Sequence, residues 1–323
     1  MVNAAAQGAP NSEFTLTVGA RTDTGKVRVN NQDAVRVWTD LPQTIPFIDR
    51  GFLFAVADGV GGNESGEVAS ALAVENLFHA YYSGDTDDIP NALKTAFNVA
   101  NSAVYDAGET QAEDRKMGTT LVAGVIRGSA LTVANVGDSR AYLFRGRTQV
   151  AQISKDHSMV AEAVRAGQLT PAQAATSRQR NIITRALGNR RNVEVDIFEV
   201  DLLPNDIIFL CSDGLYGTLE DRVIKETVHA LPPAQAADQL IEMANTQNAS
   251  DNISAVVVQV KKEGQPVLQP LPSAFQQAET TTNRMPTITE PRRSPVVAIV
   301  AAVVVLALII AAVLLFVLGV VRF

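Results

Sequence analysis

Residues 51–60, GFLFAVADGV, hold the pattern that decides the fold: six apolar side chains in a row, closed by Asp58 and Gly59. A short, unbroken apolar run that stops at turn residues predicts a buried strand. Three more runs have an aspartate at or beside one end: residues 131–136 with Asp138, residues 207–211 with Asp213, and residues 253–260 with Asp251. If these strand ends share one edge, their carboxylates form an acidic rim.

Helix-like patterns alternate with these strands over residues 13–262, which we expect to form one globular domain of the α+β class. Residues 159–180 are polar and rich in Ala and Gln, which indicates a surface insertion. A further short strand is predicted at residues 141–144. The predicted helices are residues 64–82, 90–107, 219–230 and 233–245.

Composition excludes several classes of protein. The net charge of −7 argues against nucleic acid as the main partner. One cysteine cannot form an internal disulfide or a thiolate cluster, and three histidines are too few for a histidine-rich metal centre. A metal would therefore be held by carboxylates, which favour Mg²⁺ or Mn²⁺.

The last part of the chain predicts a membrane anchor. Residues 263–295 are rich in Pro, Gln, Thr and Ser, as in a flexible linker, and residues 296–321 are uncharged and apolar. That span exceeds the roughly 20 residues that cross a bilayer. Two arginines precede it and one follows, which predicts that the globular part of the chain lies on the cytoplasmic side of the plasma membrane. Residues 1–12 lack the pattern of a secretory signal and are expected to be flexible.

The four aspartates together indicate more than each one does alone. Each Asp-Gly pair alone is typical of an ordinary turn. Several carboxylates on one rim repel one another, and a pair of divalent cations removes that cost. Such a pair, about 3.5–4 Å apart, also activates water for displacement at phosphorus. Arg28, five residues before Asp33, fits a phosphate dianion, although a surface salt bridge explains it equally well.

Eight motifs in chain order resemble those of the PPM, or type 2C, phosphatases in their bacterial form. They are RVNNQD (28–33), ADGVGG (57–62) with GEVAS (66–70), MGTT (117–120), VGDSR (136–140), DHS (156–158), NIITRALG (181–188), CSDGL (211–215) and DNIS (251–254). The resemblance spans nearly the whole globular part. It implies two packed antiparallel sheets flanked by helices. It also implies a protein serine/threonine phosphatase that hydrolyses phosphoserine and phosphothreonine by attack of a water bridging two divalent metals, Mn²⁺ or Mg²⁺.

The resemblance also implies a role for each matching residue. Asp58 would bridge the two metals and Arg28 would hold the substrate phosphate. The implied metal ligands are Asp33, Asp58, Gly59 through its carbonyl, Asp213 and Asp251. Bacterial members often hold a third, weaker metal, for which the resemblance suggests Asp213 with Asp114, or with Glu113 instead.

Other positions depart from the family pattern or have a supporting role. Asp138 resembles a structural acid in a tight hairpin rather than a direct ligand. Gln32 replaces a glutamate that binds metal in animal members, so Asp33 would take over. Val60 replaces a histidine proposed as general acid, which leaves water to protonate the departing oxygen. His157 is expected to close its loop rather than to act as a replacement acid.

Two alternatives compete with this hypothesis. A cysteine phosphatase needs an arginine six residues after its nucleophile, whereas Cys211 is followed there by Gly217. The same fold acting as a catalytically silent, membrane-bound binding module stays open, although such proteins usually lose one of the acids that are present here. A phosphatase with a narrow target usually carries regulatory domains that are not visible in this sequence. A membrane Ser/Thr protein kinase and its phosphoprotein products are the predicted partners.

Overall fold

The computed structural model describes residues 5–6, 14–40, 50–60, 64–110 and 117–262 of the chain. Two sheets lie face to face, and every strand pair recorded in them is antiparallel. The first sheet has the order β1-β2-β12-β11-β8-β9 and the second the order β10-β7-β6-β4-β3, with β5 beside β4. The strands are β1 Ala5–Ala6, β2 Phe14–Asp23, β3 Asp33–Val37, β4 Phe52–Val60, β5 Gly118–Thr119, β6 Leu121–Arg127, β7 Ala130–Val136, β8 Arg140–Arg145, β9 Gln149–Gln152, β10 Asp196–Asp201, β11 Ile207–Cys211 and β12 Ile253–Lys262.

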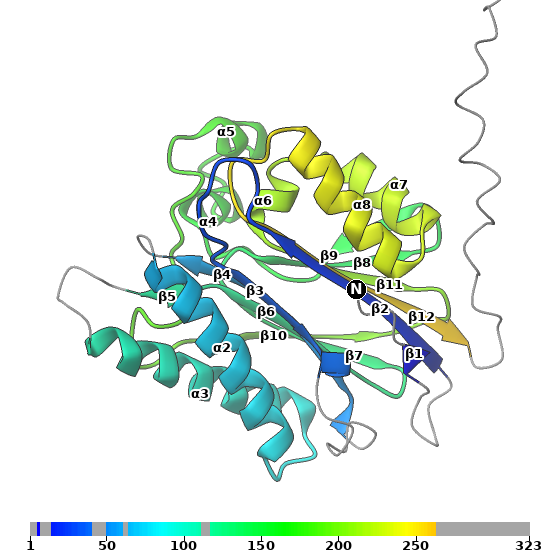
Figure 1. Ribbon diagram of the computed structural model, residues 1–323, viewed down its shortest axis with the longest axis horizontal. Helices are drawn as coiled ribbons and strands as arrows, with labels where there is room; N and C mark the ends of the chain where they lie inside the picture. The colour runs from blue at the N-terminus through cyan, green and yellow to red at the C-terminus, as the bar shows by residue number, and fades with distance from the viewer. Residues whose placement is uncertain (1–4, 7–13, 41–49, 61–63, 111–116, 263–323) are drawn as a thin grey trace, which may run out of the picture. The chain divides into compact units, whose positions relative to one another are not determined.

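Helices cover the outer face of each sheet (Figure 1). Helices α2 and α3 lie on the second sheet, and α7 and α8 lie on the first. The described helices are η1 Trp38–Asp40, α2 Glu64–Ser83, α3 Ile89–Glu109, α4 Met159–Arg165, α5 Pro171–Thr176, α6 Asp213–Tyr216, α7 Asp221–Ala230 and α8 Pro233–Thr246. The two-sheet sandwich flanked by helices is the fold that the resemblance implied.

The central strands are apolar throughout because both of their faces are buried. Along β12, Val256 and Val258 point into the layer between the sheets, whereas Ala255 and Val257 point toward α7 and α8. This alternation follows from the two-residue period of a strand. The apolar run in β4 divides in the same way between the inter-sheet layer and the layer beneath α2 and α3. Continuous apolar runs therefore mark the middle of this sandwich.

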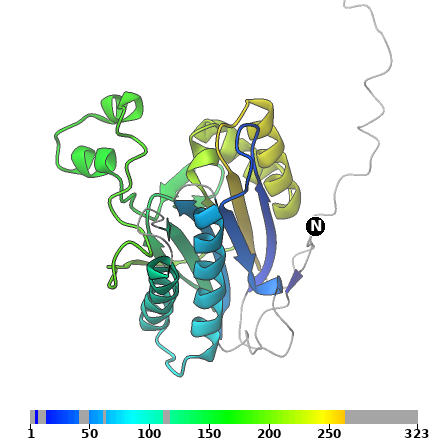
Figure 2. The ribbon, with the colours of Figure 1, turned by 60° about the vertical axis from the view of Figure 1, so that its left-hand side comes forward.

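Most of the predicted elements are confirmed. The predicted strands correspond to β4, β7, β8, β11 and β12, and the predicted helices to α2, α3, α7 and α8. Strands β2, β3, β6, β9 and β10 were not predicted. In β9 and β10 every residue is exposed or only partly buried, so the apolar signal of a central strand is missing. Residues 159–180 form α4 and α5, which stand out from the sandwich in Figure 2.

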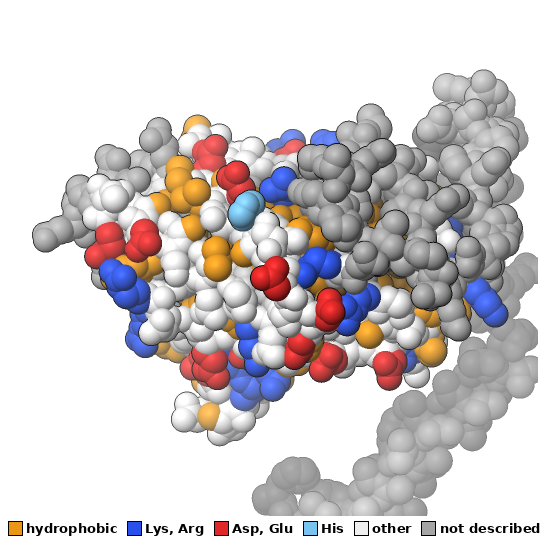
Figure 3. Space-filling view, turned by 90° about the horizontal axis from the view of Figure 1, so that it is seen from below, with side chains coloured by type: hydrophobic (Ala, Val, Ile, Leu, Met, Phe, Trp, Pro, Cys, Tyr) orange, Lys and Arg blue, Asp and Glu red, His pale blue; other side chains and the backbone are white. Residues whose placement is uncertain are grey.

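The predicted linker and membrane span, residues 263–295 and 296–321, lie outside the described residues. Among the described residues, no helix combines the length and the apolar character that a membrane crossing requires. On the face shown in Figure 3, acidic and basic side chains are interspersed.

Candidate active site

The predicted acidic rim exists, and antiparallel pairing explains it. Asp33 at the start of β3 lies opposite Asp58 near the end of β4. Cys211 at the end of β11 lies opposite Ala255 near the start of β12, which brings the residues just outside these two strands to the same edge. In an antiparallel pair, the end of one strand meets the start of its neighbour. Residues that are far apart in the sequence therefore share one end of the sandwich.

Asp33 is buried at this rim with only half of its carboxylate satisfied. Its Oδ2 accepts hydrogen bonds of 2.7 Å from the hydroxyls of Ser212 and Ser254. Its Oδ1 is buried and has no hydrogen-bond partner. Burial, together with repulsion from Asp213 and Asp251, raises the pKa of Asp33 to about 7 against the effect of the two serines.

Asp58 and Asp213 form the centre of the acidic group. Burial raises the pKa of Asp58 well above its ordinary value, and repulsion from Asp33, Asp213 and Asp138 adds to the shift. Burial also raises the pKa of Asp213, helped by Asp251, while a side-chain hydrogen bond with Asp58 opposes the shift. Like charges at this spacing favour protonation unless a cation is present.

The MGTT motif fixes the backbone of Asp58. The Asp58 amide donates to Thr120 Oγ1 at 3.0 Å, and the Asp58 carbonyl accepts from the Thr120 amide at 2.8 Å and from Thr119 Oγ1 at 2.9 Å. Both threonines are fully buried. The strand end that presents Asp58 is therefore held rigidly, which favours a preorganised site.

The rim also depends on close backbone contacts at two glycines. A Cβ at Gly59 would lie 2.1 Å from the carbonyl oxygen of Gly66, at the start of α2. A Cβ at Gly214 would lie 2.0 Å from the carbonyl oxygen of Asn252. Only glycine permits these approaches, so the Asp-Gly pairs at positions 58–59 and 213–214 serve packing as well as turn formation.

Asp138 is more closely involved than the sequence analysis expected. It is 4% exposed, and its Oδ1 has no hydrogen-bond partner. Burial raises the pKa of Asp138 to about 7, with repulsion from Asp213 as the next cause. The hairpin around it is fixed by the ion pair of Arg140 with Asp156 at 2.7 Å. Asp138 is therefore close enough to Asp58 and Asp213 to repel their carboxylates. Its signal in the sequence is an aspartate beside the end of an apolar strand, as for the other acids.

Arg28 and Asp251 meet at the solvent-exposed side of the rim. Arg28 Nη2 lies 2.7 Å from Asp251 Oδ2, and the two side chains are 51% and 37% exposed. The hydrogen bond to Asp251 is the main cause that raises the pKa of Arg28. The sequence left two roles open for Arg28, phosphate binding or a surface salt bridge. The salt bridge is present, but its partner Asp251 belongs to the acidic rim.

The other candidates take different positions. Asp114 and Glu113 lie outside the described residues. His157 is 2% exposed, and its Nδ1 accepts from the Gly137 amide at 3.0 Å. Burial lowers the pKa of His157, so a neutral imidazole closes the loop. Cys211 is fully buried, and burial raises the pKa of its thiol, which removes it as a nucleophile.

The donor set of the rim fits hard divalent cations. Carboxylate oxygens are the ligands that Mg²⁺ and Mn²⁺ prefer, and the unpartnered Oδ1 atoms of Asp33 and Asp138 are free to bind one. Among the described residues, however, no three or more acidic, histidine or cysteine side chains already stand at the spacing of a finished metal site.

Known proteins are similar to this chain in both sequence and fold. The family model described as Protein phosphatase 2C matches residues 47–253. The chain belongs to the protein phosphatase 2C family. A serine/threonine phosphatase named stp from Listeria welshimeri is 34% identical over 244 residues, which cover 74% of this chain and 94% of the relative.

Solved structures of the 2C family extend the match. The serine/threonine phosphatase PstP/Ppp from Mycobacterium tuberculosis matches with a TM-score of 0.68 and 35% identity, over 76% of this chain and 99% of that chain. The catalytic domain of PstP in complex with two manganese ions matches with a TM-score of 0.66 and 35% identity, over 77% of this chain and 99% of that chain. The fold is thus shared with solved structures of proteins that are named as serine/threonine phosphatases.

Proposed function

We propose that this chain is a metal-dependent protein phosphatase that hydrolyses phosphoserine and phosphothreonine side chains of other proteins. The observation that carries the proposal is the rim itself, where buried carboxylates without cationic partners lie beside a half-exposed arginine. Membership in the 2C family and the names of the relatives support the same reaction.

Two divalent cations, Mn²⁺ or Mg²⁺, supply charge neutralisation and a water of lowered pKa when they are bound. Asp33, Asp58, Asp213 and Asp251, together with the Gly59 carbonyl, would hold these cations. The unpartnered Oδ1 of Asp33 and the electrostatic coupling of the acids support these roles.

Arg28 holds the phosphate in this scheme. Its bond to Asp251 uses one of the five N–H donors of the guanidinium and leaves others for the phosphate oxygens. Water adds to phosphorus, the ester P–O bond breaks, and the serine or threonine oxygen takes up a proton. Val60, 38% exposed, cannot donate a proton, so solvent water supplies it.

A third, weaker cation, if it binds, is held by Asp138 together with Asp213. The buried, unpartnered Oδ1 of Asp138 and its electrostatic coupling to Asp213 favour this pair among the described residues. Asp114, the partner expected from the sequence, stays a prediction because it lies outside those residues.

The first test is phosphate release from a phosphothreonine peptide by the full chain in detergent, with Mn²⁺, with Mg²⁺ and with EDTA. We expect turnover that requires metal. If a folded protein that binds Mn²⁺ releases no phosphate, the phosphatase proposal is wrong and the silent binding module is favoured.

The proposal includes a location at the plasma membrane, with the phosphatase domain facing the cytoplasm and a membrane Ser/Thr kinase supplying its substrates. The uncharged apolar run of residues 296–321 and the arginines around it support this placement. Deletion of residues 296–323 should release the protein from membranes and raise substrate phosphorylation in cells. Unchanged fractionation of the truncated protein would contradict the anchor.

A further inference from the structure

We propose that Val27 and Val29 bind the substrate residues on either side of the phosphorylated side chain, which makes the enzyme prefer apolar residues there. This inference rests on the proposed phosphatase function and adds a sequence preference to it. The surface that carries it is the loop of residues 24–32, which joins β2 to β3 and contains Arg28.

The first observation is the exposure of these two valines. Val29 is 94% exposed and Val27 is 66% exposed. They are the two most exposed of the large apolar side chains among the described residues, and Leu203 follows at 49%. Single exposed apolar residues are common, but two that flank a charged residue at a reaction site indicate a contact surface.

The second observation is that both valines lie beside the proposed phosphate-binding group. Arg28 stands between them in the sequence and reaches Asp251 at the rim. Val60 follows Asp58 and Gly59 on β4 and is 38% exposed, which adds a third apolar side chain at the same strand end. A peptide whose phosphate is held by Arg28 would place its neighbouring residues against this loop, and the proposal assigns that contact to Val27 and Val29.

The third observation is that the loop is firmly held. Asn252, 3% exposed, donates through Nδ2 to the carbonyls of Thr24 at 2.9 Å and Asn30 at 3.0 Å. Its Oδ1 accepts from the Gln32 amide at 2.8 Å. These bonds fix both ends of the loop from one buried side chain.

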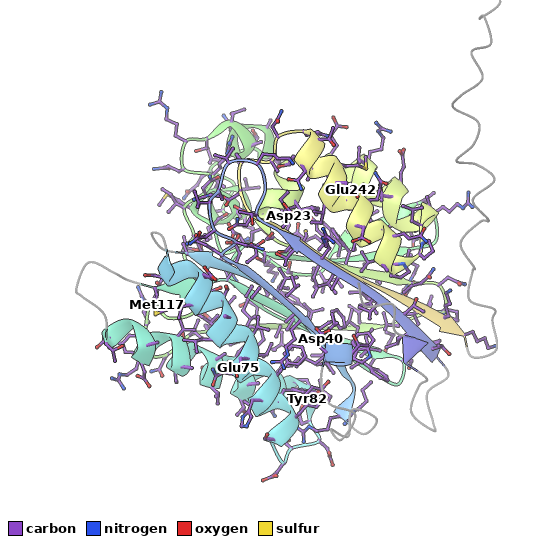
Figure 4. The ribbon with its side chains drawn as sticks, viewed as in Figure 1. Asp23, Asp40, Glu75, Tyr82, Met117 and Glu242 are labelled. Carbon is purple, nitrogen blue, oxygen red and sulfur yellow. The ribbon has the colours of Figure 1, made fainter. Side chains whose placement is uncertain are left out.

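Further bonds hold the base of the loop. The Lys26 amide donates to the Ala249 carbonyl at 3.0 Å, and Asn31 Nδ2 donates to Thr22 Oγ1 at 2.8 Å. Asp23, labelled in Figure 4 at the end of β2, accepts from the Gly25 amide at 2.9 Å. These bonds hold the loop on both sides of residues 27–29, where the two valines are exposed.

This arrangement suits an extended substrate segment. The residues before and after a phosphorylated residue lie about 6–7 Å apart in an extended chain. Val27 and Val29 are also two residues apart, so their Cα atoms cannot lie more than about 7 Å from each other. Apolar substrate side chains would remove valine surface from water, and a preordered loop lowers the entropic cost of binding.

The test compares two phosphothreonine peptides that differ only in the residues flanking the phosphothreonine, Leu on both sides or Ser on both sides. The readout is the ratio of their kcat/KM values for the full chain with Mn²⁺. Because both peptides carry the same phosphate, an indirect effect on Arg28 changes both rates and cancels in the ratio. The wild-type protein should prefer the Leu-flanked peptide about fivefold.

The variants are Val27→Ser with Val29→Ser, and Val29→Thr, which keeps the shape of the side chain. We expect the double variant to lower the preference to less than about twofold and Val29→Thr to lower it partly. Val150→Ser is the matched control, because Val150 is 43% exposed on β9, at the other edge of the first sheet from β2. It should keep the wild-type ratio.

The outcomes separate this inference from the proposed function. If the wild-type protein hydrolyses neither peptide, the proposed function is wrong and this inference falls with it. If both peptides are hydrolysed with equal kcat/KM, or if the double variant keeps the wild-type preference, the inference alone is overturned.

Discussion

The buried aspartates near the two ends of β11 have opposite surroundings. Asp206, just before the strand, is 1% exposed and forms a bidentate pair with Arg145, with Nε–Oδ1 at 3.0 Å and Nη2–Oδ2 at 2.7 Å. Its Oδ2 also accepts from the Leu203 amide at 2.8 Å. At the rim beyond the other end of the strand, Asp33 and Asp138 each keep a buried oxygen without any partner. One end of the sandwich satisfies its buried carboxylate, and the other does not.

The comparison shows that the fold tolerates a cost in stability at the acidic rim and not at Asp206. A buried carboxylate is stabilised by a cationic partner and hydrogen bonds, and without them it takes up a proton or destabilises the protein. Asp206 has its partner within the chain. The rim acids have raised pKa values because they are buried beside one another, and a divalent cation from solution would supply the partner that the chain does not. The predictions below test this contrast.

The largest expected effect is on activity at the rim. Asp58→Asn removes the central carboxylate while nearly preserving its shape, and we expect kcat/KM on a phosphothreonine peptide to fall by at least about 100-fold at saturating Mn²⁺. The stability of the metal-free protein should rise, because the variant removes like-charge repulsion. Activity within tenfold of wild type would contradict the role of Asp58.

The second effect, at the other end, is on stability. Asp206→Asn leaves Arg145 without its carboxylate and should lower the free energy of unfolding by about 3 kcal/mol, measured by urea denaturation. The kcat of the folded variant should stay within about twofold of wild type. A large loss of kcat with unchanged stability would contradict the purely structural role that this account gives to Asp206.

The third effect is a pH dependence of stability without metal. Since Asp33 and Asp138 have pKa values of about 7 in the folded protein, the folded state holds protons that the unfolded state has released above pH 4. Stability in EDTA should therefore fall as the pH rises from about 4 to 7, by up to about 1.4 kcal/mol per pH unit for each group. Asp33→Asn should flatten this slope, whereas Asp33→Glu serves as a control that keeps the charge. A slope that is unchanged in Asp33→Asn would rule out Asp33 as its source.

The smallest effect sharpens the account of His157. His157→Asn removes the ring that accepts from the Gly137 amide, and it should lower stability by about 1–3 kcal/mol. The alkaline limb of the pH–kcat profile should keep its midpoint, because a general acid acts in its protonated form and His157 does not serve as one. A shift of that midpoint would contradict a purely structural role.

The sequence was sufficient to predict the sandwich and the positions of its principal acids. Apolar runs ending in aspartate are a local signal, and antiparallel pairing then brings those ends together, as it does for Asp33 and Asp58. The environment of each acid was not predictable, because it depends on partners far away in the chain. The two serines that bind Asp33 lie 179 and 221 residues away. The burial of Asp138 beside the other acids was not predictable, because a Gly-Asp hairpin has the same sequence whether its carboxylate faces water or a buried neighbour.

The exposed strands were missed for a related reason. Strand β10 has no fully buried residue, because its apolar side chains Ile197, Phe198 and Val200 are only partly buried, so it lacks the continuous apolar run of a central strand. The contact between Arg28 and Asp251 joins residues 223 positions apart, and spacing alone could not separate a phosphate ligand from a salt bridge.

The buried acids of the rim lack a cationic partner within the chain, and in this account they bind divalent cations instead. The most direct test of that binding is the Mn²⁺ stoichiometry of the full chain by equilibrium dialysis, with Asp58→Asn and Asp206→Asn measured alongside. We expect at least two Mn²⁺ per chain for wild type and Asp206→Asn, and fewer than two for Asp58→Asn. Stoichiometric binding that is absent in wild type, or unchanged in Asp58→Asn, would contradict the account.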